Sequence, residues 1–110
     1  MDKEPVFAVQ VSGLGTSQPV IEARGEIDLA TASILAQSFA RILSGEPSDV
    51  VLDLSETTFM DCSGVSTIVE AKNQMAKESK IVLREPLPFV QSTLALLEMD
   101  SVWVIESSVA

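Results

Sequence analysis

The sequence contains no histidine and a single cysteine, Cys62. Histidine is the usual general base at neutral pH and the commonest metal ligand, so its absence removes the most frequent routes to acid–base and metal chemistry. One cysteine excludes an intrachain disulfide and a zinc site built from several cysteines. The composition therefore favours a binding protein over an enzyme, and we expect no metal and no cofactor.

Basic residues are also scarce. Lys and Arg number 7 against 16 Asp and Glu, which gives a formal net charge of −9. A surface that binds nucleic acid needs clustered cations, and here they are scattered along the sequence, so we expect no nucleic acid partner. An acidic surface suits a basic protein partner, but it is also an ordinary source of solubility.

Long hydrophobic runs are missing as well. Apolar residues make up 46% of the sequence, yet no stretch approaches the roughly 18 consecutive apolar residues of a membrane span. The opening residues MDKEP lack the basic and then apolar run of a secretion signal. We expect a cytoplasmic monomer without membrane contact, folded as one domain over residues 1–110 with a loose tail from about residue 106.

What is present is a regular alternation of apolar patterns. Strands are predicted over residues 5–11, 20–24, 50–54, 81–83 and 102–105, and helices begin near Ala32, after Asp61 and near Pro88. The loop at residues 13–19 predicts a hairpin between the first two strands. Helices that alternate with short apolar strands imply parallel pairing through right-handed crossovers. The fold class is therefore α/β with a mixed, mostly parallel central sheet, in the order β-β-α-β-α-β-α-β.

The first helix has the clearest periodicity. Its apolar face consists of Ala32, Leu35, Ala36, Phe39, Ile42 and Leu43. Either Asp28 or Thr31 is expected to cap its N-terminus, and Gly45 with Pro47 to end it. Ile34 lies off this face. An exposed apolar side chain of this kind usually has no particular role, and the alternative is that it contacts a partner.

Two further segments are predicted to be irregular: residues 25–28 as a polar break before the first helix, and residues 55–60 as a short loop. The second helix places Val65, Ile68, Val69, Met75 and Ala76 on one face. Lys72 falls inside that apolar stripe, so its stem is expected to reach the edge of the helix. A functional lysine is the alternative.

The segment Asp61-Cys62-Ser63-Gly64 opens the second helix after a buried strand. Unpaired N–H groups and a partial positive charge at a helix N-terminus favour an anion. A phosphoserine at Ser63 would carry about −1.5 to −2 charges and accept bonds from such groups. The simpler interpretation is that Asp61 or Ser63 is only an N-cap. Both roles are compatible if Asp61 caps the helix while the Ser63 hydroxyl faces out.

Other chemistries fit this segment less well. A serine nucleophile needs a base, and no histidine is available. The thiol of Cys62 at a helix N-terminus allows a redox role, against the simpler role of a packing residue. Asp28, Asp53 and Asp61 would form a Mg²⁺ cluster only if the ends of their separate elements converged.

Three motifs resemble those of a known family. Residues 50–70, VVLDLSETTFMDCSGVSTIVE, resemble the core of STAS domains and specifically the bacterial anti-sigma factor antagonists. Residues 25–32, GEIDLATA, resemble the second signature of that family. Pro88-x-Val90 with its Leu-rich helix and a closing apolar strand also fit. The resemblance covers nearly the whole chain.

The resemblance implies a phosphorylation switch. The unphosphorylated protein would bind an anti-sigma factor that is also a serine kinase of the GHKL type, and so release a sigma factor. Phosphorylation of Ser63 would block that binding, and a phosphoserine phosphatase would restore it. The implied partner surface consists of Asp28, Thr31, Ile34, Asp61, Cys62, Gly64, Ser66 and Thr67. Cys62 stands where a serine is commoner in the family.

Two rival functions stay open from the sequence. A STAS adaptor subunit of a transport or signalling complex would share the fold and dock a partner without being phosphorylated. An enzyme or nucleotide-binding protein is the second rival, although the chain lacks a Gly-rich phosphate loop followed by Lys-Ser/Thr.

Overall fold

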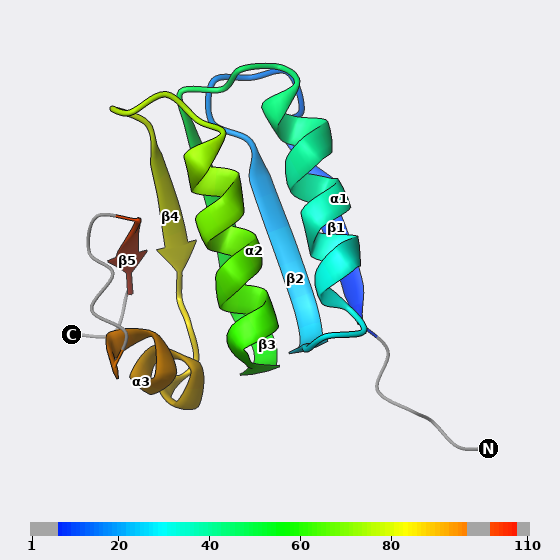
Figure 1. Ribbon diagram of the computed structural model, residues 1–110, viewed down its shortest axis with the longest axis vertical. Coiled ribbons are helices and arrows are strands. Elements are labelled where there is room, and N and C mark those ends of the chain that lie inside the picture. The colour runs from blue at the N-terminus through cyan, green and yellow to red at the C-terminus, as the bar shows by residue number, and fades with distance from the viewer. Residues whose placement is uncertain (1–6, 97–101, 108–110) are drawn as a thin grey trace.

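Figure 1 shows the computed structural model of the protein, which describes residues 7–96 and 102–107. The elements follow the predicted order of two strands and then three alternations of helix and strand. They are β1 (Ala8–Ser12), β2 (Val20–Ile27), α1 (Ala32–Leu43), β3 (Asp49–Met60), α2 (Cys62–Asn73), β4 (Lys80–Arg84), α3 (Pro88–Leu96) and β5 (Trp103–Glu106).

The five strands form one sheet in the order β1-β2-β3-β4-β5. The pair β1 and β2 is the predicted antiparallel hairpin, and each later strand is parallel to its neighbour. Helices α1 and α2 lie side by side over one face of the sheet, while α3 lies apart from them, below the carboxyl end of β4 (Figure 1). The expected α/β class with a mixed, mostly parallel sheet is therefore confirmed.

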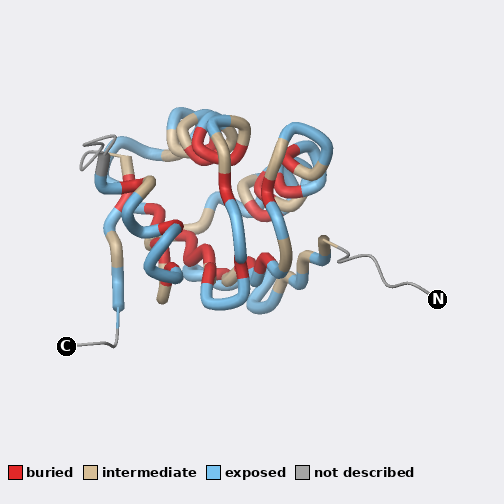
Figure 2. Tube along the Cα trace, turned by 90° about the horizontal axis from the view of Figure 1, so that it is seen from below, coloured by how far each residue is buried: buried red, intermediate tan, exposed pale blue. Residues whose placement is uncertain are grey.

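The core lies between the sheet and the α1–α2 pair, as the buried residues in Figure 2 show. Ile21, Leu52 and Leu83 form one row across β2, β3 and β4 and are fully buried. Leu35 of α1 and Ile68 of α2 are likewise fully buried in the same cluster. Because β3 is central, nearly all of its apolar run is buried, as predicted for a covered strand.

Two strands, β2 and β3, extend more than one residue beyond their predicted ends. The polar break at residues 25–28 was expected to end β2, but β2 runs to Ile27, because Gly25 adopts a φ of 104° and absorbs a bulge within the ladder. The loop predicted at residues 55–60 is wrong for a related reason. Register shifts against β2 place Leu54, Thr57 and Met60 in the core at intervals of three, so strict alternation disappears.

The helices match the patterns except at particular positions. α1 buries four of its expected residues, but Ala36 is exposed. α2 ends at Asn73, so Met75 and Ala76 do not share its face. Tight i→i−3 bonds from the N–H groups of Gln74 and Met75 close the last turn there.

The C-terminal region follows the prediction where the structure describes it. Pro88 is the first residue of α3, the position where proline suits a helix. Leu97, expected in the same helix, and the last residues of the expected loose tail lie outside the described residues. Glu106 still belongs to β5 and pairs with Arg84 at 3.0 Å. No helix within the described ranges is long and apolar enough to cross a membrane.

Candidate functional site

The site is built where β2 and β3 end together. Ile27 and Met60 are register partners at the last rung of these parallel strands. The Asp61 N–H donates to the Ile27 carbonyl at 3.1 Å, so the bond continues one residue past the ladder. Asp28 and Asp61 follow directly on the two strands, at the sheet edge where α1 and α2 begin (Figure 1). Topology therefore places the two predicted acidic residues on neighbouring chain segments.

Asp61 is the N-cap of α2. Its backbone is extended, with φ −108° and ψ −167°, and its Oδ1 accepts the Ser63 N–H at 2.8 Å. The Asp61 carbonyl accepts the N–H groups of Gly64 and Val65, which starts the helical ladder. The question left open by the sequence is therefore answered: Asp61 is the cap, and Ser63 is not.

The Ser63 side chain contributes no hydrogen bond to the described part of the fold. The residue is half-buried in the first turn of α2, and its hydroxyl has no hydrogen-bond partner among the described residues. Its carbonyl accepts the Thr67 hydroxyl at 2.9 Å one turn later, a contact within the helix. The hydroxyl is thus a free donor and acceptor at a helix N-terminus.

Asp28 and Thr31 form a reciprocal turn ahead of α1. Oδ1 of Asp28 accepts the N–H groups of Ala30 and Thr31 at 3.0 and 3.1 Å, and its N–H donates to the Thr31 hydroxyl at 2.9 Å. That hydroxyl donates in turn to the Glu26 carbonyl at 2.8 Å. The Asp28 carbonyl accepts the first helical bond, from Ala32, at 2.8 Å. Thr31 is the N-cap residue of α1 but makes no side-chain cap bond, and the Asp28 carboxylate instead accepts the N–H groups just ahead of the helix.

Gly64 fixes α2 against the strand ends. It is buried, and a Cβ on it would lie 2.7 Å from Met60 Cγ and 2.8 Å from Ile27 Cγ2. Ordinary carbon contacts are about 3.5–4.0 Å. Any side chain here would push α2 away from β2 and β3, so the position of Ser63 depends on the absence of one.

The remaining predicted residues lie on the surface of the two helix starts. Ser66 and Cys62 of α2 are exposed, and the Cys62 thiol is free. Ile34 of α1 is 43% exposed, which agrees with its place off the core face. Since α1 and α2 pack side by side, these residues and the two strand-end carboxylates border one end of the molecule.

Sequence reasoning missed two apolar features at the same end. Leu29 is 82% exposed, although it is a large apolar residue next to Asp28. The sequence signal for this exposure is position, since Leu29 precedes Ala32, the first buried residue of α1. Phe59 near the end of β3 and Phe89 of α3 stack with ring centroids 6.2 Å apart, and Phe89 is 60% exposed. Nothing local in the sequence indicates that pair.

The Mg²⁺ cluster considered from the sequence does not form. Asp53 lies on β3 beside Glu22 and Arg84, on the order of 25 Å of strand away from Asp61. Its Oδ1 accepts the Ser55 N–H at 2.9 Å. Within residues 7–96 and 102–107, no three or more His, Cys, Asp or Glu side chains are grouped to hold a metal ion.

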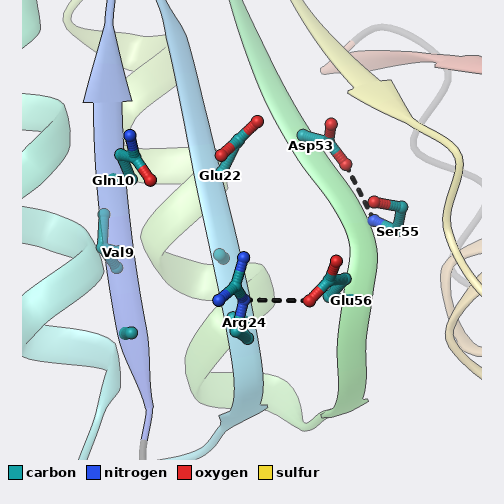
Figure 3. Close-up of a pocket in the computed structure, with 9 residues that line it drawn as sticks. Val9, Gln10, Glu22, Arg24, Asp53, Ser55 and Glu56 are labelled. Atoms are coloured by element: carbon teal, nitrogen blue, oxygen red, sulfur yellow. Dashed lines mark hydrogen bonds and ion pairs between the residues drawn. The ribbon is translucent and has the colours of Figure 1, made fainter.

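Asp53 instead lines a shallow polar pocket of about 180 Å³. The pocket is on the face of the sheet away from the helices, which lie behind the strands in Figure 3. Glu22, Glu56 and Arg24 border the same pocket, and Arg24 pairs with Glu56 at 2.9 Å. The pocket is separate from the strand ends at which Asp28 and Asp61 lie.

Solved structures share this fold. An anti-sigma factor antagonist from Mycobacterium paratuberculosis matches with a TM-score of 0.80 and 22% identity, over 96% of this chain and 90% of that one. The anti-sigma factor antagonist SpoIIAA in its unphosphorylated form matches with 0.73 and 18%, over 94% and 90%. The Bacillus cell fate determinant SpoIIAA in its phosphorylated form matches with 0.66 and 17%, over 94% and 93%.

At these identities the likeness shows the fold alone, and no curated protein matches the sequence. The family rests on a separate finding. The model of the STAS domain matches residues 9–110, which include every described strand and helix except the first residue of β1. The chain therefore belongs to the STAS domain family.

Proposed function

We propose that this protein is an anti-sigma factor antagonist whose partner binding is switched off by phosphorylation of Ser63. The observation that carries the proposal is the division of labour at the start of α2. Asp61 caps the helix, and the Ser63 hydroxyl has no partner among the described residues. Phosphate can therefore be added at Ser63 without removing a bond on which the fold depends.

Helix geometry favours the modified state locally. A phosphate in the first turn of α2 lies at the positive end of the helix dipole, which typically contributes about 0.3–1 kcal/mol. No acidic residue lies within the first turn itself, although the carboxylate of the cap Asp61 offsets part of this contribution. The added charge therefore need not unfold the domain, and its effect is on what can dock at the surface.

The docking surface combines exposed apolar side chains with carboxylates. Leu29 and Ile34 are 82% and 43% exposed, and Asp28 and Asp61 follow the adjacent strand ends. A partner with an apolar patch and basic groups complements this combination. A phosphate dianion at Ser63 would add like-charge repulsion with these two carboxylates, and a docking partner would have to strip its water, which carries a desolvation cost. A loss of about 3 kcal/mol lowers affinity roughly a hundredfold.

The family and the structural neighbours support the proposed partner class. Structural neighbours are described as anti-sigma factor antagonists, and SpoIIAA is described in both unphosphorylated and phosphorylated forms. The motif resemblance adds the finer proposal that the partner is a GHKL-type serine kinase that binds a sigma factor, with a phosphatase that reverses the modification. The proposal places this exchange in the cytoplasm and gives the protein no catalytic role of its own.

The modification is tested with the anti-sigma kinases of the source organism. Each kinase is incubated with ATP and either the wild type or Ser63→Ala, and intact mass is measured. One phosphoryl group is expected on the wild type and none on Ser63→Ala. Ser12→Ala is the control, because Ser12 is exposed at the far end of the sheet and should leave phosphorylation unchanged.

The switch is tested by calorimetric binding to the same kinase. Ser63→Asp should bind about a hundredfold more weakly than the wild type, whereas Ser12→Asp, with the same added charge, should bind normally. Equal affinity of Ser63→Asp and wild type would refute local electrostatic blocking. Tight binding to a kinase that never adds phosphate would instead identify a STAS adaptor.

A further inference from the structure

A pocket of about 320 Å³ lies at the opposite end of α2 from Ser63. It is bounded by the end of α2, the turn into β4 and the start of strand β5. Its residues are Lys72, Lys77, Glu78, Ser79, Lys80, Val102, Trp103 and Val104. The volume is at the lower end of the range of small-molecule sites, about 300–1,000 Å³.

The charge of this pocket is opposite to that of the protein. The chain has 7 basic residues and a net charge of −9, yet three lysines line this one pocket against a single carboxylate, that of Glu78. Arg24 and Arg84 are held in ion pairs, whereas the three lysines have none with any described residue. Three lysines without an ion pair to a described residue give this part of an acidic surface a local positive charge, which favours an anion.

A structural role accounts for only one of these lysines. Lys72 is in the last turn of α2, where a cation stabilises the negative end of the helix dipole. Lys77 and Lys80 lie beyond the helix, which ends at Asn73. The Lys80 N–H, but not its side chain, is used in the fold, since it donates to Asp49 Oδ1 at 2.9 Å.

Ser79 supplies an independent observation. The residue is only 7% exposed, and its hydroxyl has no hydrogen-bond partner among the described residues. No fully buried side-chain nitrogen or oxygen in the described part of the chain lacks a partner. The Ser79 hydroxyl must therefore keep access to solvent, and the pocket that Ser79 lines is that access. It is a donor without a partner among the described residues, on a residue that lines the cationic pocket.

The opposite wall of the pocket is apolar. Val102, which precedes β5, and Trp103 and Val104 of β5 line this side, and Trp103 is 5% exposed. We propose that this pocket binds a small phosphorylated organic anion. The three lysines and the Ser79 hydroxyl would hold the phosphate oxygens, and the β5 wall would hold the apolar part of the ligand. This site is independent of the proposed switch, because it shares no residue with it.

The single tryptophan makes the site directly observable. Trp103 is the only tryptophan in the chain, so the fluorescence comes from a single residue that lines this pocket. Tripolyphosphate, which does not absorb near the excitation wavelength, is titrated at about 0.15 M salt, where the Debye length of about 8 Å suppresses long-range attraction. A saturable change with a dissociation constant below about 1 mM is expected.

The matched variants compare local charge with net charge. Lys77→Gln with Lys80→Gln should weaken binding at least about tenfold. Arg24→Gln with Arg41→Gln removes the same two charges elsewhere on the surface and should leave it within about twofold. Melting curves confirm that both double variants fold.

Three outcomes would overturn the proposal: no saturable response, equal loss in the two double variants, or capture of the protein by anionic phosphatidylglycerol vesicles without any response to tripolyphosphate. The last would assign the lysines to a membrane surface. Ser63→Ala should bind tripolyphosphate as the wild type does, so failure here and failure of the switch are distinguishable.

Discussion

A Gly64→Ala substitution is expected to destabilise the protein even though alanine is the better helix former. The new Cβ would lie 2.7 Å from Met60 Cγ and 2.8 Å from Ile27 Cγ2. Met60 is flexible, but Ile27 is β-branched, stiff and 0% exposed, so it cannot move without disturbing the core. Overpacking of this kind costs about 1–3 kcal/mol. Alanine recovers roughly 1 kcal/mol of helix propensity, which leaves a net loss of about 1 kcal/mol.

The assay is urea denaturation followed by circular dichroism, with a thermal melt as a second measure. A loss of about 1 kcal/mol lowers the melting temperature by roughly 4 °C or more in a domain of this size. Gly45→Ala is the matched control, because a Cβ there meets only the Ile42 carbonyl, at 3.5 Å. Its stability should stay within about 0.5 kcal/mol of the wild type. If Gly64→Ala were as stable as the wild type, the close packing of α2 on the strand ends would not hold.

Three further substitutions test other parts of the fold. Thr57→Val should cost about 1–3 kcal/mol by urea denaturation, because the buried Thr57 hydroxyl donates to a β2 carbonyl at 2.8 Å that would lose its partner; Thr57→Ser should restore most of that, and an unchanged midpoint would contradict the assigned bond. Asp61→Ala should cost about 1 kcal/mol through loss of the α2 cap, and Asp61→Asn much less; equal losses would argue against capping. Arg24→Gln should change the free energy of unfolding by less than about 0.5 kcal/mol, since its ion pair with Glu56 joins side chains that are 61% and 62% exposed; a larger loss would show that the pair is not screened.

The order of elements could be predicted because each depends on local periodicity. The α1 pattern from Ala32 to Ile42 repeats at helical spacing, and glycine and proline follow it directly. The lengths of β2 and β3 could not, because bulges near Gly25 break the alternation by which a strand is recognised. A bulge is a property of two paired strands, and a single segment does not reveal it.

The candidate site divides in the same way. Asp61 and Ser63 are two residues apart, so capping of one by the other could be anticipated from sequence spacing. The nearness of Asp28 to that segment depends on the register of β2 against β3, which brings together residues more than thirty positions apart in the chain. The lysine pocket depends on β5 returning beside the turn that follows α2. Of the three lysines, only Lys72 departs from the sequence pattern around it, because it falls inside an apolar stripe.

The shared last rung of β2 and β3 has a consequence for what a kinase can recognise. Asp28 and Asp61 become neighbours only when Ile27 and Met60 pair. Under the proposed function, the recognised surface is therefore a conformational epitope, assembled from two distant stretches of chain. A peptide spanning the DCSG segment lacks Asp28, and an unfolded chain does not hold Asp28 beside Asp61. Modification of Ser63 would thus be restricted to correctly folded molecules. Every phosphorylated molecule would then be one that had folded before it was modified.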